Sequence, residues 1–479
     1  MTFRHIETIH QTGTVLIFLP QWNIVELLTK ILTKNSKFGS EKYLIVPLHS
    51  KVAKVDLKRI FEPAQGVRKI ILATNIAESS ITINDVMFVI DTCHANVKMF
   101  NRNNHTSYNT LWASKENLEH RRDCAGRLSE GYAFHLCSRA RFERLETHQT
   151  PEILRTALHD VALMIKLLKL GDTKDFLSRA IEQPPIDAII EAEHLLKEMK
   201  AFDKNDELTP LGKILARLPI EPRMGKMIIF GCLFGVGDAC ATVAACTSLG
   251  DPFIIPPDRK RLNKVQVDLS ANRCSDHVAI LNAFQKWSYV QKRGFSEEEF
   301  CLSNGLNPSI LKMSKDAASQ MKNILINTGF PKECLEPKDL DYDNSCPTIN
   351  NVLSLLVLGL YPNVCYHKEK RKVLTTEGKA ALVHKSSVNC SNYITTFPSP
   401  FFIFGEKIRA REIYCKQMSM INPLQLLMFG AKKVTYINKM IIIDEWLSLD
   451  MEFELAAEIL ALRPALEGLM VKVCMNPDI

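Results

Sequence analysis

The sequence lacks several features that mark common protein classes. It has 14 cysteines in 479 residues, but no two of them are separated by only two residues. Zinc modules and small disulfide frameworks depend on closely spaced cysteines, so neither class is supported and no metal site is expected. The first eleven residues contain no apolar stretch of the kind that a secretory leader needs. We therefore expect reduced, mostly buried cysteines in an intracellular protein of the nucleus or cytoplasm.

A long uninterrupted apolar run is also missing. The most membrane-like stretch, residues 227–249, is broken by Gly235-Val236-Gly237-Asp238. A charge in the middle of a bilayer is costly, so this stretch predicts two short buried helices and no membrane association.

The composition that is present is typical of folded protein. Hydrophobic residues make up 46% of the chain and charged residues 24%, which permits a sizeable core. The length allows about three or four domains. The net charge of +7 is compatible with an acidic partner such as nucleic acid but does not require one.

The first 140 residues alternate between apolar runs and helical patterns. Runs at 14–19, 44–48, 69–74 and 86–91 predict buried strands, and residues 22–34 and 52–61 predict helices. This alternation predicts a doubly wound α/β sheet with a parallel core. Ligands of such sheets bind at the carboxyl ends of the strands. The polar residues that follow each strand are therefore candidate site residues.

Two polar stretches follow these strands. Residues 74–85 are rich in hydroxyl and amide side chains, which hydrogen-bond phosphodiester oxygens but also cap helices. Residues 97–112 resemble a β-hairpin and lead to the stretch from Glu119 to Arg127, which holds three arginines and a glycine. Guanidinium groups bind phosphate oxygens in pairs, so this stretch predicts an anion-binding loop. A solvated basic turn is the alternative.

Several motifs in order resemble one family. Residues 18–23, 47–50, 73–91, 112–115 and 135–142 resemble the second RecA-like domain of DEAH-box RNA helicases of the RNA helicase A (maleless) type. The resemblance continues to the C-terminus. It implies an α/β RecA-like domain over 1–150, an α-helical winged-helix domain over 151–218 and a ratchet-like helical bundle over 219–335. An OB-like β-barrel over 345–430 follows, and residues 431–479 form a strand-and-helix tail without an assigned function.

The resemblance implies a nucleotide site for ATP and Mg²⁺ between two RecA-like domains. The P-loop and the Asp-Glu-x-His tetrad of the first domain do not occur in this sequence, which we expect to begin inside the second domain. In the family, Phe61 corresponds to the aromatic residue that stacks on adenine, although a core phenylalanine is the alternative. The arginine loop of the family reads Gln-Arg-x-Gly-Arg-x-Gly-Arg, and its fixed positions here hold His120, Arg121, Asp123, Cys124, Gly126 and Arg127.

These replacements imply a weakened site. Arg121 and Arg127 are the catalytic arginines that the resemblance retains, and Gly126 is the retained nucleotide-contacting glycine. Cys124 replaces one of the two arginine fingers, and Asp123 places a carboxylate near the phosphates. We therefore expect no ATP hydrolysis by this chain alone.

The resemblance also implies contacts with nucleic acid. The residues concerned are Thr74, Asn75, Ser79 and Ser80 after the third strand, Ser114 and Lys115 after the hairpin, and His384, Lys385, Ser386 and Ser387 in the barrel. Backbone contacts of this kind predict binding of single-stranded RNA, or DNA, without sequence preference and with strong salt dependence.

Three functional hypotheses follow from the sequence. The first is a catalytically defective helicase relative that keeps an RNA-binding half. The second is a working ATP-dependent 3′–5′ helicase whose N-terminal half lies outside this sequence. The third is a non-enzymatic interaction or dominant-negative module. A transcript that encodes a P-loop and an Asp-Glu-x-His motif in frame upstream of Met1 would favour the second.

Overall fold

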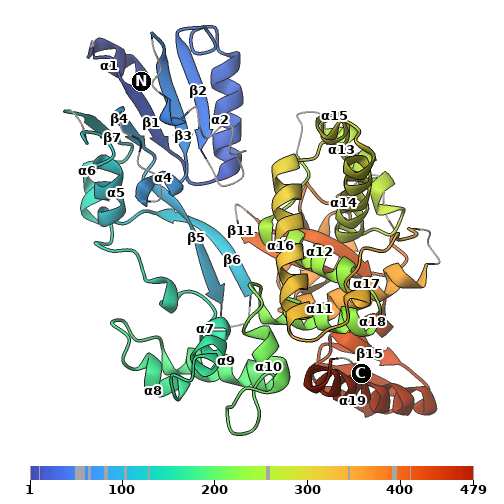
Figure 1. Cartoon of the computed structure of the whole chain (residues 1–479). Helices are drawn as coiled ribbons and strands as arrows, with labels where there is room; N and C mark the ends of the chain where they lie inside the picture. Colours follow the sequence, from blue (N-terminus) through green and yellow to red (C-terminus); the bar gives the residue numbers. More distant parts are fainter. Residues whose placement is uncertain are drawn as a thin grey trace. The chain divides into compact units, whose positions relative to one another are not determined.

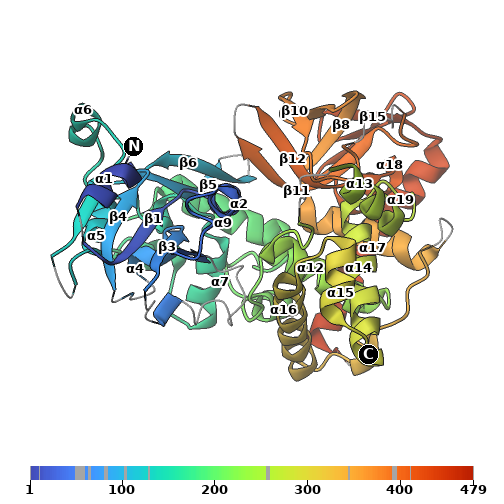
Figure 2. The ribbon, with the colours of Figure 1, turned by 90° about the horizontal axis from the view of Figure 1, so that it is seen from above.

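The structure is a computed structural model that separates into two compact units (Figures 1 and 2). It describes residues 2–9, 11–48, 60–62, 66–79, 83, 85–101, 105–127, 130–254, 259–342, 346–390, 396–409 and 412–477. Unit 1 contains residues 1–99 and 108–155, and unit 2 contains residues 100–107 and 156–479.

Unit 1 is built on a five-stranded parallel sheet with the order β2-β3-β1-β4-β7. The strands are β1 (Thr14–Phe18), β2 (Tyr43–Leu48), β3 (Arg68–Ala73), β4 (Val86–Asp91) and β7 (Tyr132–His135). All five residues of β1 are buried, because alternate side chains enter the core on opposite faces of the sheet. Val15 and Ile17 pack on one face with Val25, while Leu16 and Phe18 pack on the other.

Unit 1 also contains several helices and the greater part of a β-hairpin. They are α1 (Thr2–Thr8), α2 (Trp22–Lys34), α4 (Ile76–Ser79), α5 (Lys115–Arg122), α6 (Arg139–Glu143), the 3₁₀ turn η1 (Glu152–Leu154) and the hairpin strands β5 (His94–Asn101) and β6 (His105–Trp112). Helix α2 contributes Val25 and Leu32 to one face, and α4 contributes Ala77 to the other. Cys124, in the turn after α5, belongs to the same buried cluster as Ala77, so this turn lies against a packed core.

Unit 2 begins with a small helical domain made of α7 (His159–Leu167), α8 (Thr173–Leu177), α9 (Ile186–Glu198) and α10 (Pro210–Leu215). Residues 202 and 208 form a short antiparallel bridge between α9 and α10. The core of this domain includes Leu163, Leu196 and Leu211.

A helical bundle follows, with α11 (Pro222–Leu233), α12 (Gly237–Leu249), α13 (Arg259–Ser270), α14 (Asp276–Arg293), α15 (Glu297–Asn304), α16 (Pro308–Asn327), the 3₁₀ turn η2 (Lys332–Cys334) and α17 (Pro347–Leu360). The break between α11 and α12 confirms the predicted pair of buried helices. A β-carbon at Gly231 would lie 2.9 Å from the Cys240 sulfur, so glycine permits the close approach of these two helices.

A five-stranded barrel is formed by β8 (Val364–Glu369), β9 (Lys372–Thr375), β10 (Ala380–Val383), β11 (Phe401–Arg409) and β12 (Ile413–Ile421). Pairing of β11 with β12 closes the order β12-β10-β9-β8-β11. Its core contains Val373, Val383, Phe402 and Phe404. The predicted OB-like barrel is confirmed.

The chain ends with α18 (Pro423–Phe429), a three-stranded antiparallel sheet and the long helix α19 (Phe453–Met475). The sheet contains β13 (Val434–Ile437), β14 (Met440–Ile443) and β15 (Leu447–Asp450). Met470 and Cys474 of α19 join the core of unit 2. Among the described residues, no helix is both long enough and apolar enough to span a bilayer.

The predicted fold class is confirmed, because a parallel α/β domain, helical domains and a β-barrel follow one another along the chain. The strands predicted at 14–19, 44–48, 69–74 and 86–91 are present with shifts of at most one residue at an end. Most of the helix predicted at 52–61 lies outside the described residues, which include only its last two positions.

Candidate functional site

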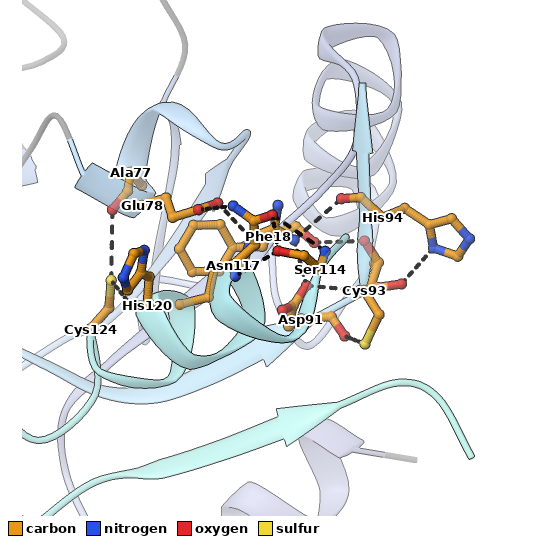
Figure 3. A network of polar contacts seen from close by, with 12 residues as sticks. Phe18, Ala77, Glu78, Asp91, Cys93, His94, Ser114, Asn117, His120 and Cys124 are labelled. Carbon is orange, nitrogen blue, oxygen red and sulfur yellow. Dashed lines mark hydrogen bonds and ion pairs between the residues drawn. The ribbon is translucent and has the colours of Figure 1, made fainter. Parts of the chain in front are cut away.

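The arginine loop is held at the carboxyl ends of the strands of unit 1 by one buried side chain, Arg121. Its exposed fraction is 1%, although arginine is rarely buried. The guanidinium Nε donates to Glu78 Oε2 at 3.0 Å, and Nη1 donates to Asp91 Oδ1 at 2.9 Å and to the His94 carbonyl at 3.2 Å. Its Cζ also lies 5.2 Å from the centre of the Phe18 ring. Figure 3 shows the partners of this network.

These contacts favour a structural role for Arg121 over the phosphate contact that the motif predicts. A buried guanidinium is tolerated only when carboxylates and carbonyls replace its hydration, and here Glu78 and Asp91 do so. Asn117 also donates to Glu78, which links α4 to α5. The network therefore fixes the helix from which the loop begins.

Cys124 lies on the buried side of the loop, where the family motif has an arginine. Its thiol donates to the carbonyls of Ala77 at 3.6 Å and His120 at 3.5 Å. Burial raises the pKa of the thiol, so Cys124 is a neutral core residue that packs with Phe18. His120 itself is exposed.

Asp123 and Arg127 form the exposed side of the loop. The Asp123 carboxylate pairs with Arg122 at 3.0 Å, and both side chains are more than half exposed. Gly126 has φ +92°, a conformation that favours glycine, and Arg127 follows it with an exposed side chain. The Arg127 guanidinium makes no hydrogen bond or ion pair with the part of the chain that the structure describes. Of the two motif arginines, Arg121 and Arg127, it is the one available to an anion.

Phe61 is 58% exposed, so the alternative of a core phenylalanine is wrong. It lies at the end of a short helical segment whose other described residue, Ile60, is fully buried. Lys69 of β3 holds this segment, because its ammonium donates to the carbonyls of Ile60 at 2.8 Å and Glu62 at 2.7 Å. Asp85 pairs with the same ammonium at 3.2 Å. Sequence reasoning missed Lys69, whose place inside an apolar strand is the signal that identifies it.

The residues after β3 divide between core and surface. Thr74 is buried and its carbonyl accepts from the Ala77 amide, whereas Asn75 is exposed. Ser80 lies outside the described residues, and the side chain of Ser79 is not described. Asn75 is therefore the candidate nucleic-acid contact that the structure presents to solvent in this stretch.

Ser114 and Lys115 are occupied at the start of α5. Ser114 is buried and forms a reciprocal capping box with Asn117. The Lys115 ammonium donates to the Glu143 carbonyl at 3.1 Å. The backbone amides of Lys115 and Glu116 donate to the carbonyls of residues 146 and 147. These contacts favour the capping interpretation over a nucleic-acid contact for both residues.

The predicted contact loop of the barrel, residues 384–387, also divides into two parts. Ser386 and Ser387 are buried, and His384 Nδ1 lies 2.8 Å from the Ser386 hydroxyl. Gln266 of α13 donates to the Ser386 carbonyl at 3.1 Å. Lys385 is exposed, so it is the residue of this loop that presents a charge to solvent.

A buried polar cluster that the sequence did not reveal holds this loop. The Asp276 carboxylate accepts from the Val388 and Met418 amides, each at 2.7 Å, and from the Ser387 hydroxyl. His277 Nδ1 lies 2.7 Å from the Ser419 hydroxyl. Burial raises the pKa of Asp276 to about 7 and lowers the pKa of His277 to about 3. Asp276 and His277 are the first two residues of α14, where polar residues are common in any helix, so no pattern in the sequence signals this buried cluster.

Four family models match successive parts of the chain. "Helicase conserved C-terminal domain" matches residues 2–129, and the winged-helix and ratchet-like parts of "Helicase associated domain (HA2)" match 192–220 and 221–297. "Oligonucleotide/oligosaccharide-binding (OB)-fold" matches 352–433.

Whole-chain comparisons lead to the same family. ATP-dependent DNA/RNA helicase DHX36 is 35% identical in Mus musculus and 36% in Homo sapiens, over 99% of this chain and 48% of each relative. DExH-box ATP-dependent RNA helicase DExH1 of Arabidopsis thaliana is 35% identical over 90% of this chain and 44% of its own length. The chain spans about half the length of the curated relatives it matches. With its RecA-like, winged-helix, ratchet-like and OB-fold domains, the chain belongs to the DEAH-box helicases and corresponds to their C-terminal half.

Proposed function

We propose that this chain is an RNA-binding C-terminal half of a DEAH-box helicase that does not hydrolyse ATP by itself. The observation that carries the proposal is the state of the arginine loop. One arginine of the motif is replaced by the buried thiol of Cys124, and another, Arg121, is enclosed by carboxylates. Only Arg127 among the proposed catalytic arginines is exposed in the described structure.

The lost arginine is the larger of the two changes in this loop. An arginine finger accelerates phosphoryl transfer by about 10³–10⁵-fold, which corresponds to roughly 4–7 kcal/mol of barrier. The carboxylate of Asp123 is exposed and pairs with Arg122, so water and a cation both screen its repulsion of phosphate. We therefore attribute most of the expected defect within the loop to Cys124.

Nucleic-acid binding is supported by a separate set of observations. The barrel matches an oligonucleotide-binding fold, and the relatives are named as DNA/RNA or RNA helicases. Asn75 and Lys385 are the predicted contact residues that are exposed. OB barrels bind single strands through basic and stacking side chains, so we infer binding of single-stranded RNA, or DNA, without sequence preference. We expect an intracellular location, in the nucleus or the cytoplasm.

The test combines binding and turnover on the purified chain. Fluorescence anisotropy with a labelled single-stranded RNA should show binding at low salt that weakens steeply as salt rises. ATP hydrolysis should stay at background with and without RNA. The absence of binding at low salt would contradict the first half of the proposal. RNA-stimulated hydrolysis that disappears in Arg127→Ala would contradict the second.

A second candidate, part of a working helicase, is favoured by the coverage of about half of each relative. In that case ATP and Mg²⁺ would bind between this RecA-like domain and a P-loop domain. ATP hydrolysis by a fusion of this chain to the preceding domain of a relative distinguishes the two candidates. Hydrolysis by the fusion favours the second candidate, and its absence favours the first. If Cys124 limits turnover, Asp123→Gly with Cys124→Arg should raise hydrolysis in the fusion, but should not do so in the chain alone.

A further inference from the structure

Two neighbouring strands of unit 1 bring four metal-binding side chains together. Asp91 ends β4 and His135 ends β7, and the two residues are register partners in the parallel sheet. Ligand atoms of Asp91, Cys93 and His135 all lie within 4.8 Å of one another. The Cys93 thiol donates to the Asp91 carbonyl at 3.5 Å, and burial together with the nearby Asp91 and Cys137 raises the pKa of this thiol.

The register explains this arrangement. Cys93 and Cys137 each follow a register partner by two residues, so an Asp-x-Cys pair lies beside a His-x-Cys pair. The Leu136 amide donates to the Asp91 carbonyl at 2.8 Å, which continues the alignment beyond the strands. The sequence concealed this cluster because its two cysteines are far apart, whereas zinc modules are identified by closely spaced cysteines.

One oxygen of the buried Asp91 lacks a hydrogen-bond donor. Oδ1 accepts from Arg121 at 2.9 Å and from the Cys93 amide at 2.8 Å. Oδ2 is buried without a hydrogen bond, and the buried Nδ1 of His135 lacks one as well. These two atoms lie 3.5 Å apart, which is long for a hydrogen bond. Asp91 is fully buried, so its unpartnered oxygen beside His135 is the observation that points to a cation-binding site.

We propose that Asp91 Oδ2, Cys93 Sγ, His135 Nδ1 and Cys137 Sγ form a tetrahedral site for Zn²⁺. Two sulfurs, an imidazole nitrogen and a carboxylate oxygen are ligands that this ion accepts, with bonds of about 2.0–2.3 Å. At tetrahedral angles, ligands with such bonds lie about 3.3–3.8 Å apart. The 3.5 Å between Asp91 Oδ2 and His135 Nδ1 is already in this range, whereas Cys93 and Cys137 have to approach the ion. Four protein ligands leave no open position, so the ion would be structural rather than catalytic.

The charges around the cluster are compatible with a divalent cation. Arg121 neutralises Asp91 through Oδ1 and leaves Oδ2 free for the ion. Binding displaces the protons of both thiols, so two thiolates surround the metal. His135 is about one-quarter exposed and Cys137 is partly exposed, which gives an ion access from solvent. The ion would join the ends of β4 and β7 beside the arginine network.

The test is a titration of the metal-free, reduced chain with Co²⁺, which reports thiolate coordination by its absorption. We expect the intense visible bands of tetrahedral cobalt to saturate at one ion per chain and to disappear when Zn²⁺ is added. Added Zn²⁺ should also raise the melting temperature. Bands that never form, or that saturate without a fixed stoichiometry, would overturn the proposal.

Variants identify the ligands. Cys93→Ala should abolish the cobalt bands, whereas Cys240→Ala, which removes another fully buried free thiol, should keep them. His135→Asn changes a partly exposed side chain and provides a second variant if Cys93→Ala fails to fold. Bands that survive His135→Asn in a folded chain would contradict the site. A Cys93–Cys137 disulfide in the freshly purified chain would contradict it too, because its sulfurs cannot act as thiolate ligands.

Discussion

The arginine loop of unit 1, residues 119–127, and the barrel loop of unit 2, residues 384–387, differ in how they are anchored. Arg121 anchors the first through ion pairs with Glu78 and Asp91. The second is anchored by hydrogen bonds, above all those of Asp276 with Val388 and Ser387.

The comparison teaches that a motif identifies a loop but not the direction of its side chains. In each loop some predicted contact residues are buried, and a single basic residue from the predicted set, Arg127 or Lys385, faces solvent. The buried residues should control stability, and the exposed ones should control binding. The two kinds of anchor should also respond differently to substitution.

The largest effect is expected for Arg121→Gln. This substitution leaves Asp91 and Glu78 buried without their cation, and removal of one partner of a buried ion pair costs about 3–5 kcal/mol. Urea unfolding of the chain measures the loss. Arg122→Gln is the matched control, because this neighbouring arginine is exposed, and its effect should stay within about 0.5 kcal/mol. Equal losses in the two variants would show that the buried network does not anchor the loop.

Asp276→Asn should cost less, about 1–3 kcal/mol, because asparagine keeps one acceptor oxygen and leaves only one of the amides of Val388 and Met418 unpaired. Because these amides fix the barrel loop, RNA affinity should fall together with stability. Unfolding and RNA anisotropy on the same preparation measure both. Stability that falls while affinity stays constant would separate the anchor from the binding surface.

The free energy of unfolding should depend on pH through the opposite pKa shifts of Asp276 and His277. The raised pKa of Asp276, about 7, gives stability at low pH that is lost as pH rises from about 4 to 7. The lowered pKa of His277, about 3, has the opposite effect, since stability is lost as pH falls from about 6.5 to 3.

In the native chain the two contributions offset each other between about pH 4 and 6.5. His277→Asn leaves the Asp276 contribution alone, so its unfolding free energy relative to the native chain should fall as pH rises through this range. The difference should change by no more than about 1.4 kcal/mol per pH unit. Urea unfolding at several pH values tests this prediction, and a difference independent of pH would contradict it.

The smallest effect is expected for Lys385→Ala. Loss of one phosphate contact should lower RNA affinity several-fold at low salt and reduce the salt slope for a single strand by about 0.7, without a change in stability. Lys379→Ala is the control in the same barrel, because that ammonium already pairs with Glu377 at 3.2 Å. Equal salt slopes in the two variants would remove Lys385 from the binding surface.

The sequence predicted the parts of this fold that depend on local pattern. Continuous apolar runs located β1 and β4, and the charge at Asp238 correctly predicted a break between two buried helices. The motif located the arginine loop, but the burial of Arg121 depends on Glu78, which lies 43 residues earlier. A contact between residues so far apart leaves no pattern in the sequence around either residue. The same reason concealed Asp276 beneath the barrel loop and the cysteines beside Asp91.

The anchoring of Phe61 by Lys69 has a consequence for how this surface can change over time. Lys69 holds backbone carbonyls on either side of position 61 and makes no bond to its side chain. The residue at position 61 can therefore be substituted without loss of the hydrogen bonds that position its backbone. Over evolution, substitutions at position 61 can change which ligand stacks on this side chain, while the local backbone conformation is preserved.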